Sequence, residues 1–178
     1  MRTEIVLTLT GPDRVGIVEE VTLALLGLSG NVEAGRMARL GGEFAILMLV
    51  SLPIEQLPDL PAAFEHLTKR GYKLTSSQTS PAPAEPREGW VDYRVEVRGA
   101  DHEGIIYEIA RGLSDRGITI ESAETGTSTA SVSGVQLFTM DALVSVPPNL
   151  AESDWMAALV DAGQQSNVDI EVSLAGEQ

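Results

Sequence analysis

The stretch GPDRVGIVEEVTLALLGLSGNVE (residues 11–33) occurs a second time, in altered form, as GADHEGIIYEIARGLSDRGITIE (residues 99–121). The two stretches align without a gap at a constant offset of 88 residues. The identical pairs include Gly11 and Gly99, Asp13 and Asp101, Gly16 and Gly104, Ile17 and Ile105, Glu20 and Glu108, Leu25 and Leu113, and Glu33 and Glu121. Self-similarity of this length indicates that a smaller unit has been duplicated.

The repeat continues beyond each stretch. VSLP (50–53) resembles VSVP (144–147), now at an offset of 94, so the second copy carries six extra residues. The small, polar run GTSTASVSG (126–134) holds them, and it is expected to form either a hairpin tip or an arm that docks a partner. The proline-rich segment 80–90 separates the copies and is typical of an extended linker. The sequence therefore predicts one module over 1–79 and another over 91–178.

Hydrophobic periodicity gives both copies the same order of elements. Residues 3–10 alternate as a half-buried strand does, and the apolar positions from Ile17 to Leu28 have helical spacing. Strands over 31–40 and 44–50, joined at Gly41-Gly42, a helix over 55–69 and a strand over 72–79 complete the first copy. The second copy repeats this order with strands 91–98, 118–126, 135–146 and 167–174 and helices 103–116 and 150–163. This βαββαβ order predicts an α+β fold of two ferredoxin-like modules, each an antiparallel four-stranded sheet with its helices on one face.

Composition excludes several classes of function. The chain has no cysteine and two histidines, which excludes disulfides, thiolate zinc sites and a cysteine nucleophile and disfavours a catalytic metal site. The net charge of −14 is concentrated in the second copy, where 91–178 hold 4 basic and 15 acidic side chains against 7 and 9 in 1–79. Nucleic-acid binding needs clustered basic side chains, so direct DNA or RNA binding is not expected. The acidic half serves solubility or offers a docking face to a protein partner.

The turn between the first strand and the first helix carries the most chemistry. A glycine ends the strand, Asp13 stands at a helix-capping position, and Gly16 permits close approach at the first helical turn. Unpaired N–H groups at a helix start favour a carboxylate, while Asp13 could cap the helix or meet an ammonium group. Asn31 begins the next strand, and its amide both donates and accepts hydrogen bonds. These residues could read both ends of an amino acid; the alternative is a capped turn with a well-placed glycine.

The segments TGPDRVGIVEEV (10–21) and GNVEAGRMARLGGEFAILMLVS (30–51) resemble the ACT domain, a regulatory module that binds amino acids at module interfaces. The layout of two modules and a short linker resembles the glycine cleavage system transcriptional repressor family. The first copy also resembles the N-terminal module of formyltetrahydrofolate deformylases, although no catalytic domain follows it. The resemblance implies ligand contacts at Asp13, Gly16 and Asn31, with their neighbours in the turn. The candidate ligand-binding residues in the first copy are Gly11, Asp13, Arg14, Val15, Gly16, Ile17 and Asn31.

The second copy keeps only part of this pattern. Asp101 and Gly104 match, but Thr119 replaces the expected asparagine and lacks its paired donor and acceptor. His102 takes the place of Arg14 and is expected to be a solvated loop residue or a pH-sensitive ligand contact. The candidate residues here are Asp101, His102, Gly104, Ile105 and Thr119. His66, late in a predicted helix, is expected at the surface.

Together these features predict a non-catalytic regulatory protein that senses an amino acid, with glycine or serine as first candidates. It is expected to control transcription of amino-acid and one-carbon metabolism through contact with a protein partner, such as a transcription activator. The alternative is a regulatory subunit that docks on a metabolic enzyme. We expect a homodimer in the cytoplasm, with no cofactor, no bound metal and no membrane segment. The glycines of the turn lack the Lys-Ser/Thr of a phosphate loop, and an acylphosphatase-like site built on Arg14 and Asn31 lacks that family's loop.

Overall fold

The computed structural model describes residues 1–79, 87–129, 134–150 and 152–176. It divides into two compact units, Met1–Glu85 and Pro86–Gln178, here called module 1 and module 2. The predicted linker over 80–90 lies mostly outside the described residues, as do 130–133 of the predicted second hairpin tip.

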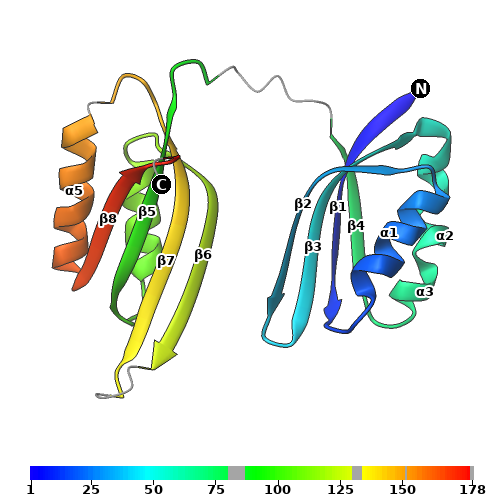
Figure 1. Cartoon of the computed structure of the whole chain (residues 1–178), viewed down its shortest axis with the longest axis horizontal. Helices are drawn as coiled ribbons and strands as arrows, with labels where there is room; N and C mark the ends of the chain where they lie inside the picture. Colours follow the sequence, from blue (N-terminus) through cyan, green and yellow to red (C-terminus); the bar gives the residue numbers. More distant parts are fainter. Residues whose placement is uncertain (80–86, 130–133, 151, 177–178) are drawn as a thin grey trace. The chain divides into compact units, whose positions relative to one another are not determined.

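Each module contains one four-stranded antiparallel sheet with helices on one face (Figure 1). The strand order is β2-β3-β1-β4 in module 1 and β6-β7-β5-β8 in module 2. In module 1 the elements are β1 (Arg2–Pro12), α1 (Ile17–Gly27), β2 (Asn31–Leu40), β3 (Glu43–Pro53), the 3₁₀ helix η1 (Ile54–Asp59), α2 (Leu60–Ala63), α3 (Glu65–Thr68) and β4 (Lys73–Thr79). In module 2 they are β5 (Val91–Ala100), α4 (Ile105–Ser114), β6 (Thr119–Thr129), β7 (Gln136–Val146), α5 (Glu152–Gln165) and β8 (Val168–Leu174). The predicted tandem ferredoxin-like fold is confirmed.

The cores form where the inner face of each sheet meets its helices. In module 1 the alternating side chains of Ile5, Leu7 and Leu9 are fully buried and lie in one cluster with Ile17 and Val21 of α1. Module 2 has its own cluster, in which Trp155 of α5 is 1% exposed and its ring meets that of Tyr93 edge to face. Each module therefore has a hydrophobic core of its own.

The predicted single helix over 55–69 is wrong. The segment is broken into η1, α2 and α3, with Phe64 in a non-helical conformation (φ −102°, ψ 3°) between the last two. Pro58 and Pro61 explain part of the break, because a proline has no N–H to donate and its ring clashes with the preceding turn. The apolar face survives the break, since Leu60, Phe64 and Leu67 are all buried.

The strand registers show where the second copy is longer. Leu40 pairs with Glu43 across the two-residue turn of module 1, and the equivalent pair in module 2 is Ser128 with Leu137. Thr129 and Gln136 add one more pair beyond it. The six extra residues of the sequence therefore fall between Ser128 and Leu137, and the rest of each sheet keeps a common register.

Candidate ligand-binding site

The turn between β1 and α1 is held to the β2–β3 hairpin by the backbone. The N–H of Asp13 donates to the carbonyl of Gly42 over 3.0 Å, which fixes the direction in which the chain leaves the sheet. Gly16 then adopts a left-handed conformation (φ 87°, ψ −1°) at the N-cap of α1, and its carbonyl accepts the N–H of Glu20. A residue with a Cβ is strained at such a φ, so glycine is the residue that this turn requires.

Module 2 builds the same turn from different side chains. The N–H of Asp101 donates to the carbonyl of Gln136 over 2.8 Å, and Gly104 opens α4 with a φ of 97°. Neither helix start has a side chain that caps it. The first N–H groups of α1 and α4 have no partner within their own helix, and they add to the positive end of the helix dipole. Both turns thus present donors suited to a small anion such as a carboxylate.

Asp13 does not cap α1, contrary to one of the two roles expected for it. Its carboxylate lies 3.1 Å from Nε of Arg39, on β2, and its side chain is 29% exposed. The reason is positional: Gly16, three residues later, takes the N-cap position. Asp13 remains a partly exposed carboxylate beside the helix start, already paired with one cation.

Arg14 belongs to a cluster of side chains beside α1, and its Nη1 also donates to the carbonyl of Val15 in the turn over 3.3 Å. Its guanidinium lies 2.5 Å from the carboxylate of Glu20 and stacks over the ring of Tyr72, 5.7 Å from the ring centre. His66 and Arg70 also approach Glu20, at 3.7 and 3.5 Å. The hydrogen bond from Arg14 lowers the pKa of Glu20 below its ordinary value. Arg14 is therefore committed to a side-chain cluster and is a weak candidate for binding a ligand.

Two of the three other residues predicted in the turn have structural roles. Ile17 is 3% exposed and belongs to the core, so only its backbone can face a ligand. Gly11 lies in β1 opposite Phe44 of β3, and a Cβ on Gly11 would meet the ring of Tyr72 at 2.5 Å. Val15, by contrast, is 99% exposed. The repeated glycine at the strand end thus makes room for a packed side chain, and Val15 is left as an apolar group on the open side of the turn.

Asn31 belongs to a different polar cluster, at the start of β2. Its Nδ2 donates to Glu33 over 3.0 Å, and Oγ of Ser51 donates to the same carboxylate oxygen over 2.6 Å. Arg2 completes the cluster by donating to the carbonyl and the hydroxyl of Ser51. The hydrogen bonds from Ser51 and Asn31 lower the pKa of Glu33. Glu33 is placed there by a bulge in β2, where the register shifts between Val32 and Ala34.

The structure does not bring Asn31 to the turn within one module. Asn31 pairs with Ser51, which pairs with Glu4 near the start of β1, whereas Asp13 follows the end of β1. Glu4 and Pro12 are eight positions apart along the strand, a span of about 26 Å at ~3.3 Å per residue. The expectation that these residues read the two ends of one amino acid therefore fails for an isolated module. β2 is nevertheless an edge strand whose ten residues are all exposed.

The module 2 residues follow the same division. His102 lies in the turn, where its ring nitrogens lie 2.8 Å from the carbonyl of Ser166 and 3.1 Å from that of Glu103. These two carbonyls raise the pKa of His102, since both favour the protonated ring. Thr119 begins β6 opposite Ser145, far from the turn before α4. Glu121, at the bulge in β6, is paired with Arg87. Ile105 is 2% exposed and is part of the core.

The sequence analysis did not identify three residues of this polar cluster as candidates: Glu33, Ser51 and Arg2. A signal for two of them was present, because Glu33 recurs as Glu121 and Ser51 recurs as Ser145. Ser51 and Ser145 are the buried polar side chains of the described residues. A polar residue repeated at a buried position indicates a hydrogen-bonding role, and here that role is to hold the bulge carboxylate at the β2 start.

Known proteins identify the kind of module. The family model described as "ACT domain" matches residues 3–73. An unknown protein from Galdieria sulphuraria is 32% identical over 98% of this chain and 99% of its own, with a TM-score of 0.82. The chain belongs to the ACT domain family. It is thus a regulatory protein by class, built of two ACT-like modules.

A second solved structure shares the fold of both ACT modules. It is a protein proposed to be a glycine cleavage system transcriptional repressor, 20% identical over 99% of each chain, with a TM-score of 0.73. No curated protein sequence matches the chain significantly. At that identity the second structure supports the tandem ACT fold alone.

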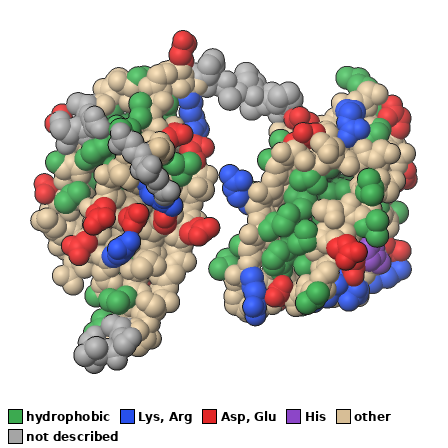
Figure 2. All heavy atoms as spheres, in the orientation of Figure 1, with side chains coloured by type: hydrophobic (Ala, Val, Ile, Leu, Met, Phe, Trp, Pro, Cys, Tyr) green, Lys and Arg blue, Asp and Glu red, His purple; other side chains and the backbone are tan. Residues whose placement is uncertain are grey.

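The outer sheet faces of the two ACT modules differ sharply in charge. In module 2 one row across the sheet consists of four acidic residues in direct register, Glu124, Asp141, Glu96 and Glu171. The same row of module 1 is Arg36, Leu47, Thr8 and Thr75. Figure 2 shows charged side chains gathered over the sheet of module 2 and hydrophobic ones over that of module 1. The acidic half of the sequence therefore contributes a row of four carboxylates across its sheet.

Two of these carboxylates are paired and two are not. Arg94 lies 2.9 Å from Asp141, and Arg98 lies 2.7 Å from Glu96. Across the part of the chain that the structure describes, Glu124 and Glu171 have no ion-pair partner. Among those residues there is also no cluster of three or more side chains able to hold a metal ion. None of the described helices is long and apolar enough to cross a membrane.

Proposed function

We propose that this ACT-domain protein is a non-catalytic sensor of an amino acid, with glycine and serine as first candidates. The observation that carries the proposal is the turn before α1, in which Gly16 opens the helix in a left-handed conformation and leaves the first N–H groups without a helical partner. The amino-acid carboxylate binds these N–H groups, because unpaired donors and the helix dipole both favour an anion there. The ammonium group binds Asp13, which is 29% exposed.

A second copy of the chain completes this site. In the proposed dimer, two β2 strands pair antiparallel along their exposed edges about a centre between Gly35 and Arg36, so that Asn31 of one copy lies opposite Leu40 of the other. Leu40 is next to Arg39, whose side chain holds Asp13, so the amide of Asn31 reaches the turn that it cannot reach within its own module. Such pairing also satisfies the open backbone groups of an edge strand. The proposal therefore includes a homodimer with two equivalent sites.

Output passes through protein contact in the cytoplasm, and not through direct binding of nucleic acid. The net charge of −14 and the acidic row across the module 2 sheet repel phosphates and favour a basic protein surface. The fold shared with the proposed glycine cleavage repressor favours control of transcription in glycine and one-carbon metabolism. The partner is then a transcription activator, whose affinity changes because the amino acid binds its two states unequally.

Calorimetric titration of glycine and serine into the full chain tests the site. Asn31→Ala should weaken binding by about 1–3 kcal/mol, the cost of unpairing a buried polar contact. Asp13→Ala should weaken it similarly. The matched controls are Thr119→Ala and Asp101→Ala in module 2, which should leave the titration of module 1 unchanged. Unchanged affinity in Asn31→Ala, with the fold confirmed by circular dichroism, would remove Asn31 from the site.

Affinity capture from native extract, with and without the amino acid that binds, tests the output. A DNA-binding activator captured in an amino-acid-dependent way supports the proposal. Capture of a metabolic enzyme would assign the chain to regulatory subunits instead. Deletion of 127–133 should weaken capture and leave the calorimetric affinity intact, because these residues belong to module 2 whereas the proposed site is in module 1.

A further inference from the structure

Two guanidinium groups and an imidazole of module 1 converge on the carboxylate of Glu20. Arg14 lies 2.5 Å from its Oε2 and donates a hydrogen bond to it. Arg70 and His66 approach the same oxygen less closely, at 3.5 and 3.7 Å. Arg14 by itself therefore pairs with Glu20, and the other two cationic groups are in excess.

The corresponding part of module 2 lacks this positive charge. Gly71 and Asn167, both with a positive φ, mark the same turn before the last strand, and the strand registers agree with their offset of 96 residues. At this offset HLTKRGYK (66–73) corresponds to AGQQSNVD (162–169). The first segment holds three basic side chains and a histidine, whereas the second holds one aspartate and no basic side chain. The cationic cluster is therefore specific to module 1.

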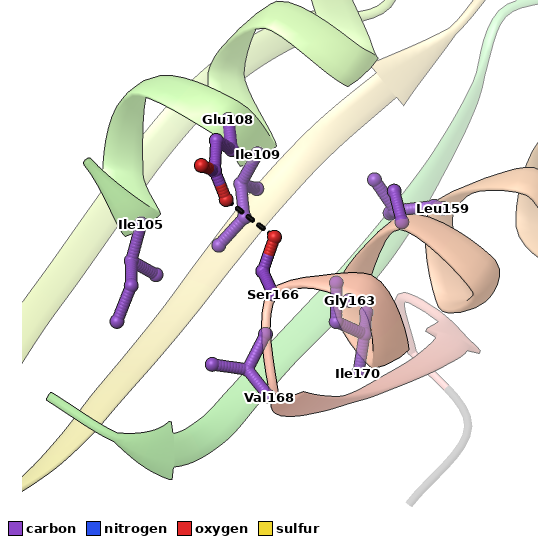
Figure 3. Close-up of a pocket in the computed structure, with 9 residues that line it drawn as sticks. Ile105, Glu108, Ile109, Leu159, Gly163, Ser166, Val168 and Ile170 are labelled. Atoms are coloured by element: carbon purple, nitrogen blue, oxygen red, sulfur yellow. Dashed lines mark hydrogen bonds between the residues drawn. The ribbon is translucent and has the colours of Figure 1, made fainter. Parts of the chain in front are cut away.

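Module 2 also shows that a carboxylate at this position does not need a cation. Glu108 is the counterpart of Glu20, and Ser166 stands where module 1 has Arg70. Figure 3 shows Glu108 and Ser166 pointing toward one another, and the Ser166 hydroxyl donates to the carboxylate. The ion pairs of the described module 2 residues all involve other carboxylates. The need to balance Glu20 therefore does not account for Arg70 and His66.

Arg70 and His66 are also the cationic groups of the cluster that solvent reaches most. Their side chains are 52% and 51% exposed, against 24% for Arg14. Arg14 lies over the ring of Tyr72 and is already paired. Figure 2 shows Lys, Arg and His side chains gathered at one corner of module 1. A guanidinium and a protonated imidazole both donate to oxyanions, so this corner suits an external anion.

We propose that Arg70 and His66 bind a phosphate group, free or on a small molecule, at the surface beside Glu20. Nη1 of Arg70 and Nε2 of His66 lie within 3.7 Å of one oxygen, so they are at most about 7 Å apart. One phosphate group spans that distance, since its oxygens accept hydrogen bonds of ~2.8 Å on two sides. With His66 protonated, the three cations and Glu20 carry a net charge of +2, which a phosphate dianion balances and a carboxylate does not. The site is separate from the proposed amino-acid site at Asp13 and Asn31.

Calorimetric titration of inorganic phosphate, methyl phosphate and acetate into the full chain tests the proposal. The titration is run in low salt at about pH 6.5, where histidine is half protonated and a phosphate ester carries most of its second charge. Two charge-assisted hydrogen bonds lead us to expect a Kd of about millimolar for phosphate. Acetate should bind more weakly. Comparable binding of methyl phosphate extends the site to phosphate esters, and its failure to bind restricts the site to free phosphate.

Module 2 supplies the substitutions that remove the cations, since serine and alanine stand at the two positions there. Arg70→Ser and His66→Ala should each weaken phosphate binding about fivefold, the upper value for an exposed ion pair. Glu20→Gln should tighten it by a similar factor, because this variant removes the negative charge beside the ligand. Glu19→Gln is the matched control. It changes the net charge equally, from a neighbouring position outside the cluster, and should leave the phosphate Kd unchanged.

The proposal is overturned if phosphate does not bind, if acetate binds as tightly, or if Glu20→Gln and Glu19→Gln have equal effects. The exposed positions of Arg70 and His66 keep the test valid if Glu20→Gln lowers the stability of module 1. Phosphate affinity that is unchanged in both Arg70→Ser and His66→Ala also overturns it. Titration of glycine or serine into the same variants reports only on the other site, so the two proposals fail separately.

Discussion

The left-handed glycine at the start of α1 gives a prediction whose sign depends on the structure. In Gly16→Ala the new Cβ has space, since the nearest atom is Nη1 of Arg14 at 3.9 Å. The cost therefore comes from backbone strain alone, about 1–2 kcal/mol for a residue with a Cβ in this region. Restriction of the unfolded chain by alanine returns about 0.4–1 kcal/mol. The net destabilisation of module 1 should be about 1 kcal/mol.

Gly27→Ala is the matched control in the same helix. Gly27 ends α1 without a positive φ, and no atom lies within 4 Å of its added Cβ. Alanine there should stabilise module 1 by about 0.5 kcal/mol, through helix propensity and the unfolded state. The two variants should thus differ by about 1.5 kcal/mol, roughly tenfold in the unfolding equilibrium.

Native-state hydrogen exchange in the full chain measures both effects locally. The tryptophan signal cannot, because Trp90 and Trp155 both belong to module 2. Amides of β1 and α1 should lose protection in Gly16→Ala and gain it in Gly27→Ala. Equal protection in the two variants, or a gain in Gly16→Ala, would refute the left-handed turn and with it the proposed carboxylate site.

Two further predictions concern charge. Glu124→Arg, which copies Arg36 of module 1, should stabilise module 2 by a few tenths of a kcal/mol, because it removes one like charge opposite Asp141. Urea unfolding, monitored by tryptophan fluorescence, measures the change in stability. The gain should shrink in high salt, and a gain that is independent of salt would contradict the electrostatic cause. Glu20→Gln should destabilise module 1 at neutral pH. The reason is that Arg14 lowers the pKa of Glu20 in the folded state, so the ionised carboxylate stabilises the module above its ordinary pKa of 4.5. The difference from the unaltered chain should vanish as the pH falls through the lowered pKa; a difference that persists there would assign the effect to packing.

The fold could be predicted because its signals are local. Strand alternation and the stripe from Ile17 to Leu25 depend on neighbouring residues, and the duplication is found by comparing two stretches of the sequence. All three match the structure. The helix over 55–69 could not be predicted by periodicity alone, since the spacing of Leu60, Phe64 and Leu67 survives a break between them. Pro58 and Pro61 are the sequence features that indicate a break, because proline interrupts a helix, and the apolar spacing alone does not show it.

The candidate site was predictable only in part, because its contacts join distant positions. Gly16 was identified correctly as a special backbone position, since a glycine before a helical stripe has a local meaning. The fate of Arg14 depends on Tyr72, 58 residues away, and no local pattern indicates that stacking. Asn31 was grouped with Asp13 by its hydrogen-bonding chemistry and by resemblance, whereas the strand–helix–strand crossover places the start of β2 at the same end of the sheet as the start of β1. The distance between Asn31 and Asp13 within one module therefore follows from the βαββαβ order that the sequence predicts.

The central claim is that the chain senses an amino acid through the module 1 turn and the β2 edge. Titration of each of the twenty amino acids into the full chain, with the affinity measured by calorimetry and the mass by light scattering, tests it most directly. We predict saturable binding of a small amino acid, glycine or serine first, to a dimer, with one ligand per turn completed by Asn31. Absence of binding by all twenty, or tight binding to a monomer that Asn31→Ala leaves unchanged, would contradict the account.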